Sequence, residues 1–265
     1  MRESFGEQPT SEIIEVGKEI NEELDKVRES RINPETFRDA KFFNDQEIDA
    51  DLAYVDAKER DFEERAQSYT PEQRVIRDNA EVIEVMMPMI IRDFDWLGKN
   101  ANIISTSRYD DIANGIDSVA QLMEPNETWN IGMEIDFTSS EEEMKDKIRK
   151  IETRLKEGKV SSVKYFDSPT TGKLKNLKMP KIAFGAPGRE MNDFVSLVAD
   201  AYLSKNRESA QKELRNHKMK DRFIQLTANQ LREFGKVAIE AGSVENALLH
   251  HGVLERFKQR GLIRE

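Results

Sequence analysis

Three acidic residues lie on two neighbouring segments that have the pattern of β-strands. Asp117 lies within residues 115–119, and Glu134 and Asp136 lie within residues 131–137. Side chains two positions apart on an extended strand point to the same face of a sheet, so Glu134 and Asp136 should lie together. If the two strands are neighbours, Asp117 joins them in a cluster of two or three carboxylates.

Such a cluster is costly without a cation, because like charges in one site repel each other and raise the pKa of a carboxyl group. A divalent metal ion with oxygen ligands is the usual solution, and Mg²⁺ typically takes one or two carboxylates. The sequence therefore predicts a Mg²⁺ or Mn²⁺ site formed by Asp117, Glu134 and Asp136. Acidic residues also occur on exposed strands by chance, and that alternative stays open.

The composition argues against several other kinds of site. The 265 residues include no cysteine, so disulfides and thiolate metal sites are excluded, and the histidines are His217, His250 and His251. No histidine lies near an acidic motif, which argues against a histidine zinc site and a Ser-His-Asp triad. No stretch approaches the ~20 apolar residues of a membrane span, and the first residues lack the apolar region of a signal peptide. We therefore expect a cytoplasmic protein without a membrane partner.

Charge is distributed unevenly along the chain. The formal net charge is −10, and residues 1–70 carry 20 acidic and 10 basic side chains. By contrast, residues 173–189 carry five basic side chains and no acidic one, and residues 205–222 are mostly basic. The acidic N-terminal region could bind a protein partner, and the basic segments could contact the phosphates of a nucleic acid. Solvent-exposed helix faces explain the second basic segment equally well.

Helical patterns dominate both ends of the chain. Ser11 can cap a helix of about 20 residues, and residues 49–67 form a highly charged helix or arm. Thr70-Pro71-Glu72-Gln73 has the pattern of a capping box, and the helix that begins there should kink or end at Pro88. Further helices are expected at residues 139–158, 191–203, 221–241 and 244–259.

The middle of the chain has the shorter period of β-strands. A short strand is expected at residues 103–106, and strands at 116–123 and 129–138 should form a hairpin. The next helix then crosses to a strand at residues 160–166, which should run parallel to the strand before it. Residues 181–185 predict a weaker additional strand.

This order of elements resembles the αβββαβ core of the PD-(D/E)XK nuclease superfamily. The likeness rests on Gly115-Ile116-Asp117 at the start of one strand and on the acid-x-acid pattern of residues 134–136, and it covers roughly residues 71–168. It implies an α/β (α+β) fold with a small mixed sheet. The organisation would be an acidic helical region at residues 1–70, a nuclease-like core at 71–203 and a helical region at 204–265.

The resemblance also implies roles for the acidic residues. Asp117 matches the motif aspartate of the family, and Glu134 or Asp136 matches the acid that follows it. In the family these carboxylates bind Mg²⁺, which activates a water molecule for attack on a phosphodiester bond. A helical glutamate upstream often contributes, and Glu81 and Glu84 are suitably placed, although a plain surface position explains them more simply.

The lysine of the family motif is not in its usual place. It should stand two residues after the second acid, where this chain has Asp136 or Thr138. Lys164, on the strand expected to run parallel, is the geometric candidate for its role. Lys147 and Lys150 on the crossover helix are alternatives, and the core could also be an inactive copy.

Two further motifs have simple structural explanations. Asp111 could approach the same site, but turn formation explains Asp110 and Asp111 more simply. The sequence Gly185-Ala186-Pro187-Gly188-Arg189 precedes a helix but lacks both the Lys-Ser/Thr of a P-loop and the GxGxxG spacing. We therefore interpret it as a loop.

These observations favour a metal-dependent nuclease that hydrolyses phosphodiester bonds in DNA or RNA, with Asp117, Glu134, Asp136 and Lys164 as its catalytic residues. The alternative is a catalytically inactive nuclease-like scaffold that acts as a protein-interaction module, which the displaced lysine and the acidic N-terminal region favour. A nucleotidyltransferase site also uses strand aspartates to hold Mg²⁺. The Gly-Ser turn that this class requires does not precede Asp117.

Overall fold

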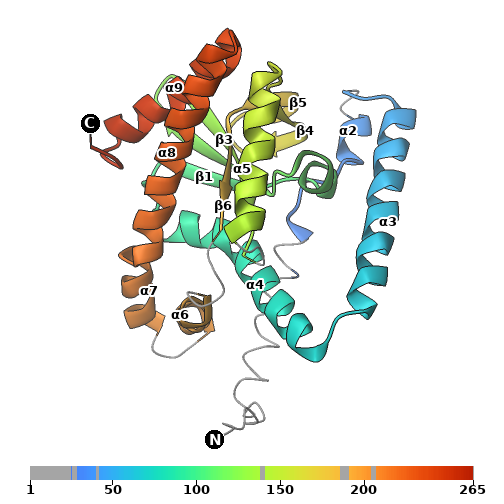
Figure 1. The fold of residues 1–265 in the computed structure, drawn as a ribbon, viewed down its shortest axis with the longest axis vertical. Coiled ribbons are helices and arrows are strands. Elements are labelled where there is room, and N and C mark those ends of the chain that lie inside the picture. Colours follow the sequence, from blue (N-terminus) through green and yellow to red (C-terminus); the bar gives the residue numbers. More distant parts are fainter. Residues whose placement is uncertain are drawn as a thin grey trace, which may run out of the picture.

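The computed structural model describes residues 25, 29–39, 42–137, 141–185, 191–203 and 207–264, which form a mixed α+β fold (Figure 1). The helix expected after Ser11 lies outside the described residues. None of the described helices is long and apolar enough to span a membrane.

A four-stranded sheet forms the centre of the fold, with the strand order β1-β2-β3-β6. Neighbouring strands are antiparallel from β1 to β3, and β6 runs parallel to β3. The expected hairpin is confirmed, because a turn at residues 125–126 joins β2 directly to β3. The four strands are β1 (Ala101–Ser105), β2 (Ser118–Glu124), β3 (Glu127–Ile135) and β6 (Lys181–Phe184).

The strand expected to run parallel to β3 was assigned to the wrong segment. Residues 160–166 belong to β4 (Ser161–Ser168), which pairs antiparallel with β5 (Gly172–Met179) in a separate two-stranded sheet. The hydroxyl groups of Ser168 and Thr171 hydrogen bond across the intervening turn, and the chain folds back at once. β4 is therefore paired locally, and the crossover from β3 continues to β6, the strand that the sequence indicated only weakly.

Two long helices precede the sheet, and capping boxes fix where both begin. They are α3 (Asp45–Gln67) and α4 (Pro71–Asp93). The short helix α2 (Thr36–Asp39) precedes α3. The expected capping box of α4 is confirmed, since Thr70 Oγ1 accepts from the backbone of Gln73, whose side chain accepts from the Thr70 backbone. The helix continues through Pro88, so Pro88 does not end it.

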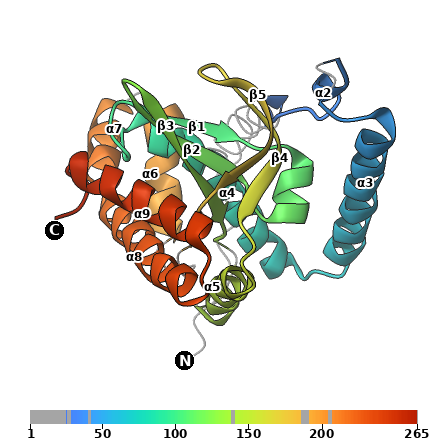
Figure 2. The same cartoon turned by 90° about the horizontal axis from the view of Figure 1, so that it is seen from above.

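The main hydrophobic core lies between one face of the sheet and a layer of helices (Figure 2). Alternate residues from Ile131 of β3 to Phe137, just beyond the strand, pack there against α4, α6, α8 and α9. The core therefore includes side chains from both the central and the C-terminal parts of the chain. The remaining helices are α5 (Glu141–Lys156), α6 (Met191–Leu203), α7 (Arg207–Arg215), α8 (Lys218–Glu240) and α9 (Val244–Gln259).

The opposite face of the sheet is covered by the β4–β5 hairpin. Ile116 and Val119 pack there against Val163, Phe166 and Met179. The hairpin in turn anchors the N-terminal helices, because Tyr165 of β4 packs against Phe37 and Ile48. Figures 1 and 2 both show α3 at the side of the molecule, away from α8 and α9.

The side chain of Gln230 of α8 hydrogen bonds to the backbone of β6, the strand at the edge of the sheet. Its side chain accepts from the backbone N–H of Ala183 at 2.8 Å and donates to the carbonyl of Ala183 at 2.7 Å. Both Gln230 and Ala183 are buried. The amide therefore replaces the strand that β6 lacks on its outer side.

We predict that Gln230→Leu lowers the free energy of unfolding by about 2–4 kcal/mol, because it leaves one buried donor and one buried acceptor without partners. Urea unfolding monitored by circular dichroism measures this loss. Gln225→Leu, at an exposed position of the same helix, is the matched control and should change stability by less than about 0.5 kcal/mol. Equal effects of the two substitutions would contradict the proposed role of Gln230.

Candidate functional site

Asp117 lies immediately before β2, at the level where β3 ends. Its backbone N–H donates to the carbonyl of Met133 at 2.9 Å, which extends the β2–β3 pairing by one residue. Its side-chain Oδ2 accepts from the backbone N–H of Ile135 at 2.5 Å. The strand pairing therefore fixes both the position and the direction of this carboxyl group.

The segment before Asp117 is a short π-helix, η1 (Asp110–Asn114), which ends at Gly115. Gly115 has φ 60°, a left-handed conformation that glycine adopts readily. Asp110 is fully buried and accepts hydrogen bonds from Ser107 Oγ and from the backbone N–H groups of Lys164 and Tyr165. Asp110 therefore has a structural role, and it anchors η1 to β4 so that Asp111 lies beside Asp117.

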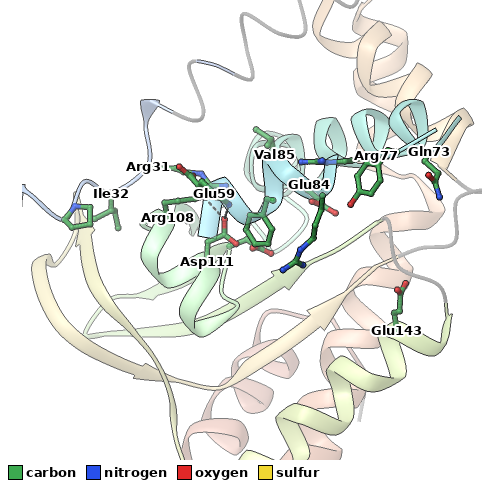
Figure 3. Close-up of a pocket in the computed structure, with 15 residues that line it drawn as sticks. Arg31, Ile32, Glu59, Gln73, Arg77, Glu84, Val85, Arg108, Asp111 and Glu143 are labelled. Atoms are coloured by element: carbon green, nitrogen blue, oxygen red, sulfur yellow. Dashed lines mark hydrogen bonds and ion pairs between the residues drawn. The ribbon is translucent and has the colours of Figure 1, made fainter. Parts of the chain in front are cut away.

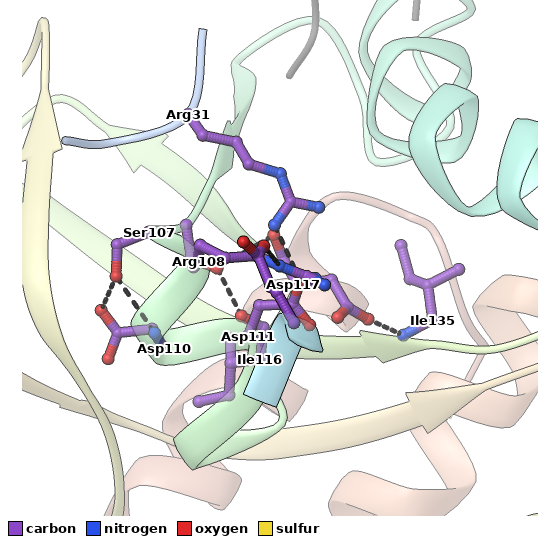
Figure 4. A network of polar contacts seen from close by, with 10 residues as sticks. Arg31, Ser107, Arg108, Asp110, Asp111, Ile116, Asp117 and Ile135 are labelled. Atoms are coloured by element: carbon purple, nitrogen blue, oxygen red, sulfur yellow. Dashed lines mark hydrogen bonds and ion pairs between the residues drawn. The ribbon is translucent and has the colours of Figure 1, made fainter. Parts of the chain in front are cut away.

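The carboxyl groups of Asp111 and Asp117 share a hydrogen bond (Figure 4). Burial and the neighbouring Asp111 hold the pKa of Asp117 well above its usual range. Burial also raises the pKa of Asp111, but the hydrogen bond with Asp117 and the charges of Arg31 and Arg108 outweigh it and lower that pKa. The arginines contact Asp111 Oδ2 at 2.7 and 2.5 Å, respectively. Of the two groups, Asp111 is therefore the one that loses its proton at the lower pH.

Glu84 of α4 adds a third carboxyl group to the site. Its Oε1 accepts from the backbone N–H of Phe137 at 3.0 Å, just beyond the end of β3. Burial, opposed by this hydrogen bond and reinforced by the charge of Asp136, raises the pKa of Glu84 to about 7. Of the two helical glutamates considered from the sequence, Glu84 thus lies in the site, and the side chain of Glu81 lies outside the described residues.

Glu134 and Asp136 are held by lysines. Lys147 of α5 contacts Asp136 and also lies 3.2 Å from Glu134 Oε1. Lys181 of β6 pairs with Glu134 Oε2 at 2.7 Å. Burial lowers the pKa of Lys147, but the two carboxylates outweigh it, so the pKa lies above its usual value and the ammonium group stays charged. The charges of Asp136 and Lys147 both act on Glu84, which links this ion-pair network to the Asp111–Asp117 pair.

Lys164, the candidate for the motif lysine, points toward the N-terminal helices. Its ammonium group lies 2.5 Å from Asp51 Oδ2 of α3 and over the rings of Phe43, Tyr109 and Tyr165. These contacts fasten α3 to β4. The structure therefore brings Lys147, the alternative on the crossover helix, to the two acids of β3, and engages Lys164 elsewhere.

A cavity of about 1090 Å³ opens in front of Asp117, between α3, α4 and η1 (Figure 3). Glu134, Asp136 and Lys164 are not among its lining residues. Charged side chains of both signs line it: the acids Glu59, Glu84, Asp111, Asp117 and Glu143, and the arginines Arg31, Arg65, Arg77 and Arg108. A negatively charged ligand with a bound cation would find partners for both charges here.

The donor chemistry of the site suits a hard divalent cation. Among the described residues, no three His, Cys, Asp or Glu side chains already stand in an arrangement that could hold a metal ion. Lysines hold Glu134 and Asp136, so Asp111 and Asp117 are the carboxyl groups that remain for a cation at this end of the sheet. Asp111 and Asp117 could hold a divalent cation in place of the proton between them, and Glu84 lines the same cavity.

Except for Arg108, the arginines of the site and of the cavity wall could not be predicted from the sequence. Arg31 lies near the end of the helix expected after Ser11, and Arg65 and Arg77 also lie on helical segments, where basic residues are usually solvated. Arg108 could have been found from the sequence, because it directly precedes Tyr109-Asp110-Asp111, a run of polar residues before a glycine turn.

Comparisons with protein-family models, curated proteins and solved structures found no match for this chain.

The raised pKa of Glu84 should make the free energy of unfolding depend on pH. A carboxyl group whose pKa is raised by folding favours the native state below its unfolded pKa of 4.5, and this contribution is lost as the pH rises through about 7. Without metal, the free energy of unfolding of the wild type should therefore fall between about pH 5 and pH 8. In Glu84→Gln this fall should be smaller by about 3 kcal/mol. Urea unfolding in EDTA at the two pH values measures the difference.

Glu240→Gln, at an exposed position near the end of α8, serves as the control and should leave the pH dependence as in the wild type. If Glu84→Gln and the wild type lose the same stability with rising pH, the carboxyl group of Glu84 is not in the buried environment described here.

Proposed function

We propose that this protein is a metal-dependent nuclease of the PD-(D/E)XK type, which hydrolyses phosphodiester bonds in DNA or RNA. The observation that carries the proposal is the convergence of Asp117, Asp111 and Glu84 at the end of β3, on the wall of a cavity that also carries arginines. Such a site can bind Mg²⁺ or Mn²⁺ and a phosphate group together.

The order of elements supports the proposal. The helix α4 precedes the strands β1, β2 and β3, and α5 follows them on the way to the parallel strand β6. We interpret this order as a nuclease-like core in which the β4–β5 hairpin is inserted before the last strand. A shared fold does not give a function by itself, so the argument depends on the site.

In the proposed mechanism, Asp117 and Asp111 would hold a cation, which would supply charge compensation for the phosphate and activation of the attacking water. The strand β3 keeps Asp117 oriented through the N–H of Ile135, and the N–H of Phe137 keeps Glu84 beside it. With a pKa of about 7, Glu84 can accept a proton from the attacking water near neutral pH. Arg31 and Arg108 can each exchange Asp111 for a phosphate oxygen.

Lys147 is the residue that we propose for the role of the motif lysine. From α5 it contacts both Glu134 of β3 and Asp136, which directly follows the strand. Asp136 and Glu134 hold this ammonium group in position. This assignment replaces Lys164, whose partners are Asp51 and aromatic rings.

The experiment is a cleavage assay on labelled single-stranded DNA, duplex DNA and RNA with Mg²⁺ or Mn²⁺. We expect the wild type to cleave at least one of them, and EDTA to stop the reaction. Asp117→Asn and Lys147→Met should each lower the rate by roughly 100-fold or more, because each removes a group that takes part in the reaction. Lys150→Met, at an exposed position of the same helix, is the control and should retain the wild-type rate.

Two results would count against the proposal. One is the absence of metal-dependent cleavage by folded wild-type protein on all three substrates, which would favour the inactive scaffold that binds a protein partner. The other is cleavage that persists in Asp117→Asn, since the activity would then come from another site or from a contaminant. A full rate in Lys147→Met would overturn the role of Lys147 alone.

A further inference from the structure

The cavity has a second stretch of wall, farther along α3 and α4 from the carboxyl groups, that the proposed chemistry does not use. Phe62 and Arg65 lie on α3, Tyr69 lies between the helices, and Arg77 lies on the second turn of α4. All four side chains line the same cavity as Asp117. Two aromatic rings and two arginines thus stand together on the wall of a candidate phosphodiester site.

These four residues form two stacked pairs. The guanidinium group of Arg65 lies 5.8 Å from the ring centre of Phe62, and that of Arg77 lies 5.5 Å from the ring centre of Tyr69. Among the side chains that the structure describes, no carboxylate pairs with either arginine. Arg31 and Arg108 differ in this respect, because both are held by Asp111. The stacked arginines keep their hydrogen-bond donors for a ligand.

The second wall leads to the carboxyl groups. Gln73, Arg77 and Glu84 are four and seven residues apart, so they share one face of α4, and all three line the cavity (Figure 3). At 1.5 Å per residue this stripe runs about 16 Å along the helix, from its first turn to the site. A chain molecule lying along it would meet the arginine–aromatic pair first and the reactive carboxyl groups afterwards.

We propose that this wall binds a single strand of nucleic acid, with its phosphates on Arg65 and Arg77 and its bases against Phe62 and Tyr69. The proposal rests on the nuclease function proposed above and specifies its substrate as an unpaired strand or end. Arginine binds phosphate oxygens through several donors, and a ring stacks on a base of any sequence. We therefore expect little sequence preference.

The aromatic rings are the reason for choosing a single strand over a duplex. In a duplex the bases are stacked on each other inside the helix, so a side-chain ring can stack on them only where the strand is unpaired. A wall that bound duplex backbones would need the arginines alone. The helix α3 also covers this side of the cavity, so the bound strand lies between α3 and α4.

Fluorescence anisotropy of the full-length protein in EDTA tests the proposal without cleavage. The probes are a fluorescein-labelled oligothymidylate and a hairpin duplex of equal length, each titrated over a series of salt concentrations. Phe62→Leu/Tyr69→Leu should weaken binding of the oligothymidylate by about tenfold and leave duplex binding unchanged. Arg65→Gln/Arg77→Gln should reduce the dependence of log K on log salt by about 0.7 for each phosphate contact that is lost.

The matched control is Arg60→Gln/Arg232→Gln, which removes the same charge from exposed positions outside the cavity. It should bind the single strand as the wild type does. The proposal is overturned if the duplex binds as tightly as the single strand, or if the aromatic double variant binds the single strand with wild-type affinity. Since binding is measured without metal, single-strand binding in a protein that cuts nothing refutes the nuclease function alone. Metal-dependent cutting of duplex by a protein that does not bind single strands refutes only the present inference.

Discussion

The site depends on the position of the carboxyl group of Asp117, which lies beside the carboxyl groups of Asp111 and Glu84. Pairing between β2 and β3 positions its backbone, and the N–H of Ile135 orients its side chain. Asp110 in turn anchors η1 to β4 and so brings Asp111 against it. Because like charges repel, a proton or a cation between the two groups stabilises this arrangement, in addition to the arginines that pair with Asp111.

The positive charges around the site divide into two groups with different consequences. Lys147, Lys181, Arg31 and Arg108 neutralise acids, and they reduce the charge that a metal-free site must bear. Arg65 and Arg77 stack on aromatic rings instead, on the wall that α3 and α4 provide. The first group reduces repulsion within the acidic cluster, and the second provides the positive charge to which we assign phosphate binding. The packing of Tyr165 against Phe37 and Ile48 keeps α3 in place, so the two functions depend on one scaffold.

Local patterns were enough to find the elements that carry the acids, but not the contacts between distant parts of the chain. The capping box at Thr70, the β2–β3 hairpin and the boundaries of α9 could be predicted, because each depends on residues near in sequence. The parallel strand could not, since β4 and β6 compete for the position beside β3 and the turn after Ser168 decides between them. Lys164 was assigned to the site for the same reason. An ammonium group on a long side chain goes to the nearest buried acid, which is Asp51 in the folded protein and 113 residues away along the chain.

The most direct test of the account is a calorimetric titration of Mn²⁺ near pH 6, below the pKa of about 7 of Glu84, in two buffers with different enthalpies of ionisation. If a cation replaces the proton between Asp117 and Asp111, binding is saturable and releases protons, so the measured heat differs between the buffers. Asp117→Asn should abolish both the binding and the release. Absence of saturable binding by the folded protein, binding without proton release, or wild-type binding by Asp117→Asn would contradict the account.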